Sequence, residues 1–142
     1  MLKRDEQALL YQFKDEGRIA VVEKTLHRLG IKTRLIPPDA YQQKVGYLLG
    51  RKGFRPLPAE VDGFIFPHEV LLLDNIKGKR LDAVLAALQE SVRPGLHYKA
   101  VVTPFNSFWT LRRLCETMQK EHSFMIAQEK EKERRGRIHE KE

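Results

Sequence analysis

Apolar and polar positions alternate along the chain in blocks that predict strands and helices in turn. Residues 7–13 (QALLYQF) form a short apolar run, as expected of a strand. A helical pattern follows, with four apolar side chains on one stripe: Ile19, Val22, Leu26 and Leu29. Gly30 is suited to the left-handed end of this helix. Residues 31–36 (IKTRLI) alternate and stop at two prolines, which predicts a peripheral strand.

The next segment is the least regular part of the chain. Residues 39–50 (DAYQQKVGYLLG) predict a short helix with Asp39 as its N-cap. Residues 50–63 (GRKGFRPLPAEVDG) contain three glycines and two prolines and predict a long surface loop. Long loops inside small domains are uncommon and often functional, so this loop is a place to look for a site.

Two further strand–helix pairs complete the pattern. Residues 69–75 (EVLLLDN) are almost entirely apolar, which is typical of a strand covered on both faces. The helix after it carries one apolar stripe and ends at Pro94-Gly95: Ile76, Leu81, Val84, Leu85, Leu88 and Val92. Residues 97–103 (HYKAVVT) predict a fourth strand. The last helical stripe comprises Phe108, Leu111, Leu114, Cys115, Met118 and Met125.

This alternation predicts an α/β fold, a small three-layer sandwich of about four mostly parallel strands with flanking helices and right-handed crossovers. The expected strand order is 2-1-3-4. Residues 1–127 are expected to form a single α/β domain, and residues 128–142 a charged C-terminal helix or a disordered tail. No internal repeat is evident beyond the strand–helix unit itself.

Composition limits the classes of function. The chain has 142 residues, a net charge of +7 and a single cysteine, so an intramolecular disulfide is impossible. Six Lys or Arg and five Glu nearly cancel in residues 128–142, which leaves most of the positive charge on the body of the protein. No signal peptide or membrane-spanning stretch is recognised, so a cytoplasmic, bacterial protein is expected, without membrane association.

The carboxyl ends of the strands are the predicted place for a ligand, because open α/β sheets bind ligands there. Helix N-termini at those ends also favour anions. Seven side chains at the turns are candidates for this rim: Asp15, Asn75, Lys77, Lys79, Thr103, Asn106 and Trp109. The simpler interpretation is structural: Asn106 or Ser107 caps a helix, Trp109 packs over the next helix, and the lysines are solvated.

No catalytic residue, metal site or cofactor is predicted. The chain lacks the GxxxxGK[ST], GxGxxG and GxSxG motifs of phosphate loops, dinucleotide folds and nucleophile elbows. None of the five histidines pairs with another His or Cys at helical spacing. Cys115 lies on an apolar stripe and is interpreted as a core thiol. His122 is in phase with Met118 and Met125 on the same stripe and is interpreted as a residue between the core and the surface.

Several functions therefore stay open. The leading hypothesis is a non-enzymatic α/β binding or interaction module with a protein partner or a small anionic ligand. The alternative is an enzyme or receptor for a phosphorylated or carboxylated compound at the strand rim. Nucleic-acid binding through residues 50–55 (GRKGFR) is a weaker alternative, because no nucleic-acid-binding fold signature is present. Phe124 and Ile126 suggest a homodimer through the last helix.

Two stretches carry a resemblance to a known family: residues 44–54 (KVGYLLGRKGF) and residues 98–122 (YKAVVTPFNSFWTLRRLCETMQKEH). The run Thr-Pro-x-Asn-x-x-Trp-Thr is the more specific of the two. The chain resembles, over about residues 7–125, a family of small bacterial α/β proteins, mostly from Firmicutes, that is defined only as a domain of unknown function. The resemblance implies the fold and the compartment, and it implies no activity, cofactor or catalytic residue.

Overall fold

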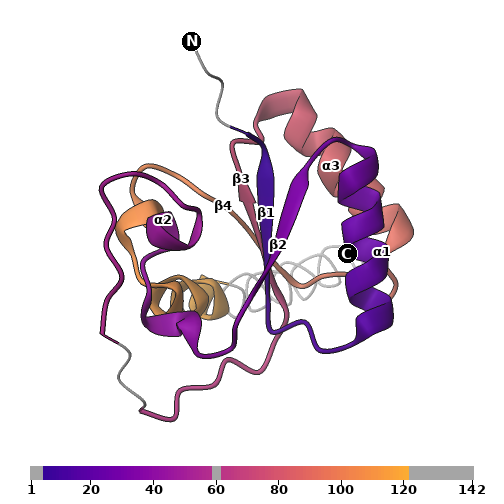
Figure 1. Cartoon of the computed structure of the whole chain (residues 1–142). Helices are drawn as coiled ribbons and strands as arrows, with labels where there is room; N and C mark the ends of the chain where they lie inside the picture. The colour runs from indigo at the N-terminus through magenta and orange to yellow at the C-terminus, as the bar shows by residue number, and fades with distance from the viewer. Residues whose placement is uncertain (1–4, 59–61, 122–142) are drawn as a thin grey trace, which may run out of the picture.

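The computed structural model describes residues 5–58 and 62–121, and its elements follow the predicted order (Figure 1). The first half contains β1 (Gln7–Tyr11), α1 (Glu16–Arg28), β2 (Lys32–Ile36), the 3₁₀ turn η1 (Ala40–Gln42) and α2 (Val45–Leu48). The second half contains β3 (Val70–Asp74), α3 (Gly78–Ser91), β4 (Tyr98–Val101), the 3₁₀ turn η2 (Asn106–Phe108) and a helix over 111–121. His122, Phe124, Met125, Ile126 and the charged extension lie outside the described residues.

The four strands form one sheet in the order β2-β1-β3-β4, as predicted. The β1–β2 and β3–β4 pairs are parallel, but the central β1–β3 pair is antiparallel, with Leu9 opposite Leu72. The reason is the path of residues 37–69. Ile36 and Val70 both lie beside Tyr11, so this segment leaves and re-enters the sheet at the same end of the strands. A parallel β1–β3 pair would require the segment to cross over to the opposite end of the strands.

Two units of the same design make up the chain, a repeat that the sequence pattern did not reveal. Each unit runs strand, helix, strand, 3₁₀ turn, helix; the first spans residues 7–48 and the second residues 70–121. Both have a non-glycine residue in the left-handed region directly after the first strand, Gln12 (φ 62°) and Asn75 (φ 63°). The two units share apolar spacing but few identical residues, so the repeat is visible in the structure and not in the sequence pattern.

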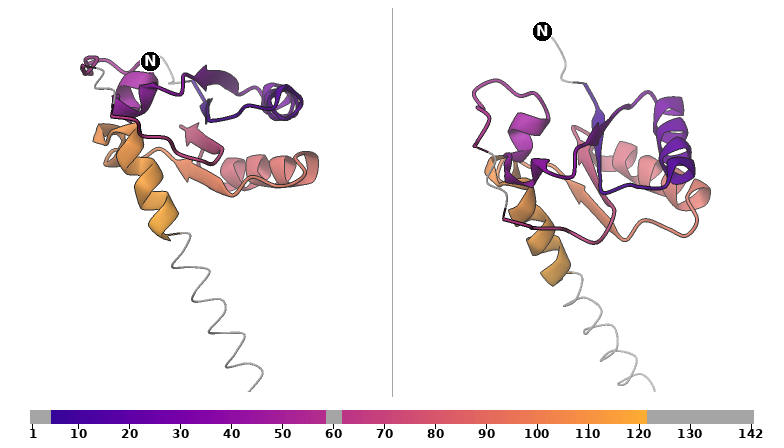
Figure 2. Two further views of the ribbon diagram at one scale, coloured as in Figure 1. Left: turned by 90° about the horizontal axis from the view of Figure 1, so that it is seen from below. Right: turned by 60° about the horizontal axis from the view of Figure 1, so that its bottom comes forward.

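An approximate two-fold relation connects the two units. Besides the antiparallel β1–β3 pair, Lys44 and Thr110 form an antiparallel bridge. The hydrogen bonds around it are reciprocal: Val45 N–H donates to the carbonyl of Trp109 (2.9 Å), and Leu111 N–H donates to the carbonyl of Gln43 (2.9 Å). Figure 2 shows the consequence, with α1 beside α3 and α2 beside the helix over 111–121. Equivalent positions in the two units can therefore be compared directly.

The sheet separates two hydrophobic cores, as a three-layer sandwich requires. Alternate side chains of β1 point to opposite faces: Ala8 and Leu10 toward α1 and α3, Leu9 and Tyr11 toward α2 and the helix over 111–121. β3 is buried along its full length, as predicted for a central strand.

Two local predictions are wrong. Asp39 precedes η1, but its side chain makes no capping hydrogen bond there. Phe108 does not join the last helix, because that helix begins only at residue 111. The Thr110 hydroxyl accepts a hydrogen bond from Arg113 N–H (3.2 Å) and so caps it. Phe108 belongs to η2 instead and is 63% exposed.

Candidate functional site

The predicted rim is divided between the two opposite ends of the strands, because β1 and β3 are antiparallel. Asp15 follows β1 and lies at the end where β3 begins. Asn75, Lys77 and Thr103 follow β3 and β4 and lie at the other end, beside the start of β1. The expectation that all strand ends share one rim is therefore wrong, and only the second unit keeps its candidates together.

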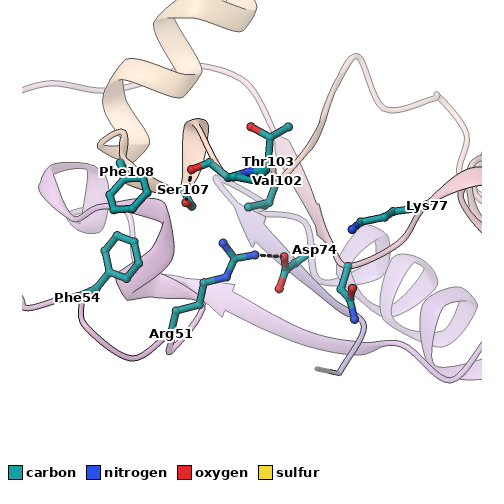
Figure 3. Close-up of a pocket in the computed structure, with 10 residues that line it drawn as sticks. Arg51, Phe54, Asp74, Lys77, Val102, Thr103, Ser107 and Phe108 are labelled. Carbon is teal, nitrogen blue, oxygen red and sulfur yellow. Dashed lines mark hydrogen bonds and ion pairs between the residues drawn. The ribbon is translucent and has the colours of Figure 1, made fainter. Parts of the chain in front are cut away.

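A pocket of about 360 Å³ opens at the carboxyl ends of β3 and β4 (Figure 3). Three parts of the chain form it: the loop after α2, the end of β3 with the start of α3, and the turn after β4. Its lining residues are Arg51, Phe54, Asp74, Asn75, Lys77, Val102, Thr103, Pro104, Ser107 and Phe108. The two stretches that carried the family resemblance, far apart in sequence, thus meet around one cavity.

An ion pair between Arg51 and Asp74 lies in the wall of the pocket (Figure 3). Arg51 Nη2 donates to Asp74 Oδ1 at 2.6 Å, and the Asp74 side chain is only 1% exposed. Gln7 Nε2 donates to the second carboxylate oxygen (3.3 Å) and to the carbonyl of Leu49 (3.2 Å). The buried Arg51 Nε has no hydrogen-bond partner among the described residues. Asp74 is thereby neutralised, while Arg51 keeps unused donor capacity.

Two phenylalanine rings form the opposite side of the pocket. The Phe54 and Phe108 centroids are 5.2 Å apart, with the rings inclined at 39°. The Phe54 ring lies directly on Gly46, where an added Cβ would overlap it. Gly46 is therefore the small residue that makes room for this ring. Phe108 stays largely exposed at the mouth of the pocket.

The start of α3 supplies the positive side of the pocket. Figure 3 shows Lys77 reaching toward the cavity from the side opposite the two rings. The first N–H groups of any α-helix lack an intrahelical partner, and the N-cap residue of α3, Lys77, makes no side-chain hydrogen bond to them. The equivalent helix α1 differs: Asp15 accepts hydrogen bonds from Gly17 N–H (2.8 Å) and Arg18 N–H (3.2 Å). The N-terminus of α1 is closed by a carboxylate, and that of α3 is open.

Thr103 and Asn106 fold the turn after β4. Asn106 Oδ1 accepts from Thr103 N–H (2.7 Å), and Thr103 Oγ1 accepts from Asn106 N–H (3.1 Å). Asn106 Nδ2 also donates to the carbonyl of Val101 (3.0 Å). Because these bonds use both ends of its amide, Asn106 fixes the backbone instead of facing a ligand.

Two other rim candidates do not line the pocket. The ring of Trp109 packs against the core shared by α2 and the helix over 111–121, and Arg113 stacks on it at 4.4 Å from the centroid. This agrees with the structural interpretation of Trp109. Lys79 is exposed in the first turn of α3.

Burial decides the chemistry of the single thiol. Cys115 is completely buried, and this desolvation raises its pKa from 9.0 to about 12. It is a core thiol, as the sequence indicated. Within residues 5–58 and 62–121, no group of three or more His, Cys, Asp or Glu side chains is arranged to hold a metal ion. No helix in those same ranges has the length and apolar character needed to cross a bilayer.

Comparison with known proteins points to the second unit. A family model, the domain of unknown function DUF3783, matches residues 69–125. The matched region begins just before β3 and includes α3, β4, η2 and the helix over 111–121. It contains the TPFNSFWT stretch and leaves residues 44–54 outside, so it is shorter than the expected resemblance. No curated protein and no solved structure matches the chain.

Seven of the ten lining residues were not among the rim candidates, and three of these shape the pocket most: Arg51, Phe54 and Phe108. Arg51 and Phe54 were recognised only as parts of a basic loop, and Phe108 was placed in the core. A usable signal was present in the loop: the apolar pattern of the strands and helices does not account for its length or its mixture of Arg, Lys and Phe. The path of residues 37–69 brings this loop to the pocket, and the pattern of apolar and polar positions does not specify that path.

Proposed function

We propose that this protein is a cytoplasmic, non-enzymatic binding module that takes a small anionic ligand in the pocket at the ends of β3 and β4. One observation carries the proposal: the cavity combines Arg51 and Lys77 with the uncapped N-terminus of α3. Backbone N–H groups at a helix start and adjacent cations form a common arrangement for phosphate and carboxylate groups.

The two-fold relation supports an anion at this place. At the helix starts, Asp15, the N-cap of α1, corresponds to Lys77, the N-cap of α3. In the first unit the protein's own carboxylate fills the helix N-terminus. In the second, the Lys77 side chain has no acceptor atom and makes no capping hydrogen bond. A ligand anion would make there the contacts that Asp15 makes at α1.

Binding is favoured over catalysis because the polar groups of the lining are already engaged. Asp74 is held by Arg51 and Gln7. The Ser107 hydroxyl donates to the carbonyl of Pro104 (2.9 Å), and Thr103 Oγ1 accepts from a backbone N–H. General-base or nucleophilic chemistry needs a group free to exchange its proton with substrate, and these groups are committed to the fold.

A thermal-shift screen against phosphorylated and carboxylated metabolites tests the proposal. A compound present at about 100 times its dissociation constant should stabilise the native state by about 2.7 kcal/mol and raise Tm by several degrees. The rise should be smaller in Lys77→Ala, which removes the ammonium group at the mouth of the pocket. If no anion in the panel raises Tm, or if Lys77→Ala responds like the unaltered protein, the proposal is wrong.

A further inference from the structure

The exposed ring of Phe108 is not required by the fold. It occupies the last position of η2, and the equivalent last position of η1 is Gln42. The two turns have the same 3₁₀ geometry and lead into the same reciprocal bridge. Since one unit builds this turn with a polar residue, the aromatic side chain in the other is available for a different purpose.

The position of the second ring, Phe54, depends on a glycine at residue 46. Phe54 reaches its position only because residue 46 is glycine, inside a short helix where glycine is unfavourable. It then meets Phe108 with a 5.2 Å separation of centroids. The result is a pair of rings at the mouth of a cavity, with most of the Phe108 surface open to solvent. Planar, exposed faces of this kind stack on flat heterocycles.

Two cationic side chains line the same cavity, and two more lie in the loop that adjoins it. Arg51 and Lys77 line it, and Lys52 and Arg55 are exposed in the loop that carries Phe54. The carboxylate in the wall, Asp74, is already paired with Arg51. A cavity of about 360 Å³ is near the lower end of the range for small-molecule sites, which fits one nucleotide-sized ligand.

We propose that the ligand of this pocket is a nucleoside phosphate, with its base stacked on Phe108 and its phosphate beside Lys77. This inference rests on the proposed function, which requires only an anion, and it adds a planar ring. Figure 3 shows the spatial order it needs: rings on one side, the Arg51–Asp74 pair between, and Lys77 on the other side. The phosphate and the base are therefore recognised by different parts of the chain.

Calorimetric titration with adenosine 5′-monophosphate, ribose 5-phosphate and adenosine separates the two contributions. The nucleotide should bind at least about tenfold more tightly than ribose 5-phosphate, since stacking on one exposed ring is worth that much. Phe108→Ala should remove this advantage and leave the affinity for ribose 5-phosphate unchanged. Phe105→Ala is the matched control, because Phe105 precedes the same turn, is 80% exposed and does not line the pocket.

The outcomes distinguish the two proposals. Equal affinity for the nucleotide and ribose 5-phosphate would overturn the nucleoside inference and leave anion binding intact. Absence of binding by both phosphates would contradict both. Loss of nucleotide binding in Phe105→Ala as large as in Phe108→Ala would also overturn the assignment of the base to Phe108.

A second titration distinguishes a free nucleotide from a single-stranded nucleic acid as the ligand. A six-residue single-stranded oligoadenylate should bind more tightly than the mononucleotide if Lys52 and Arg55 contact neighbouring phosphates, and that gain should weaken steeply with salt. Equal affinity for the two identifies a free nucleotide as the ligand. Both results support base stacking at Phe108, provided that Phe108→Ala weakens each of them.

Discussion

Lys44 and Thr110 face each other across an antiparallel bridge, and the hydrogen bonds flanking it are equal in length at 2.9 Å. The bridge relates a helix start in the first unit to the equivalent helix start in the second. Because the units share their backbone design, the first unit serves as an internal reference for the second. Differences between equivalent residues, such as Asp15 and Lys77 or Gln42 and Phe108, then mark what the fold does not require.

Arg51→Ala should destabilise the protein strongly. The substitution leaves the Asp74 carboxylate, 1% exposed, with only Gln7 as a side-chain partner. Removing one member of a buried ion pair costs about 3–5 kcal/mol, and urea unfolding measures the loss. The double variant Arg51→Met with Asp74→Leu is the control, since removing both charges should restore part of the stability. A double variant less stable than Arg51→Ala would contradict this assignment.

Gly46→Ala should disturb the pocket through Phe54. The new Cβ would overlap the Phe54 ring, which must move away from Gly46 and from Phe108. We expect a loss of about 1–3 kcal/mol of stability, measured by urea unfolding, together with weaker ligand binding. Gly95→Ala is the matched control, because a Cβ there meets no atom within 4 Å. Equal effects of the two substitutions would show that Phe54 is not seated on Gly46.

Asn106→Ala should affect stability but not ligand affinity. The amide holds the turn through Thr103 N–H and the carbonyl of Val101, so its loss should cost about 1–2 kcal/mol. Chemical denaturation gives the first quantity and calorimetric titration the second, with an expected change in affinity below about twofold. A variant that unfolds normally yet loses binding would place Asn106 in contact with the ligand.

The protein should lose stability in alkaline solution through Cys115. Burial raises the pKa of this thiol from 9.0 to about 12 in the folded state. Its contribution is complete below pH 9 and is lost as the pH rises toward 12, because the unfolded chain releases the proton first. The slope for one proton is about 1.4 kcal/mol per pH unit. The free energy of unfolding, followed from pH 8 to pH 10, should therefore fall more steeply in the unaltered protein than in Cys115→Ala.

The fold could largely be predicted from the sequence because apolar spacing determines it. The continuous run at 70–74 required a central strand, and the alternation at 31–36 required an edge strand. The direction of β3 relative to β1 could not be predicted. It depends on residues 37–69 returning to the same end of the strands. A loop with prolines and glycines can return to that end or cross to the opposite one.

The candidate site could be predicted only in part, for the same reason. Asn75, Lys77 and Thr103 were identified because strand ends can be located from the pattern. Arg51 and Phe54 could not be placed without knowing where their loop folds. Phe108 was assigned to the core because its spacing from Leu111 and Cys115 suits a helix, whereas the helix begins at residue 111.

The most direct test of the central claim compares Lys77→Ala with Lys14→Ala in a titration with ribose 5-phosphate followed by backbone amide NMR. Lys14 and Lys77 are both exposed and each lies two residues after the left-handed residue of its unit, so both variants lose the same net charge. We expect chemical-shift changes at residues 75–79 and 103–108, and a rise in the dissociation constant of about tenfold in Lys77→Ala alone. Equal weakening in the two variants, or shifts centred on residues 12–17, would contradict an anion site at the ends of β3 and β4.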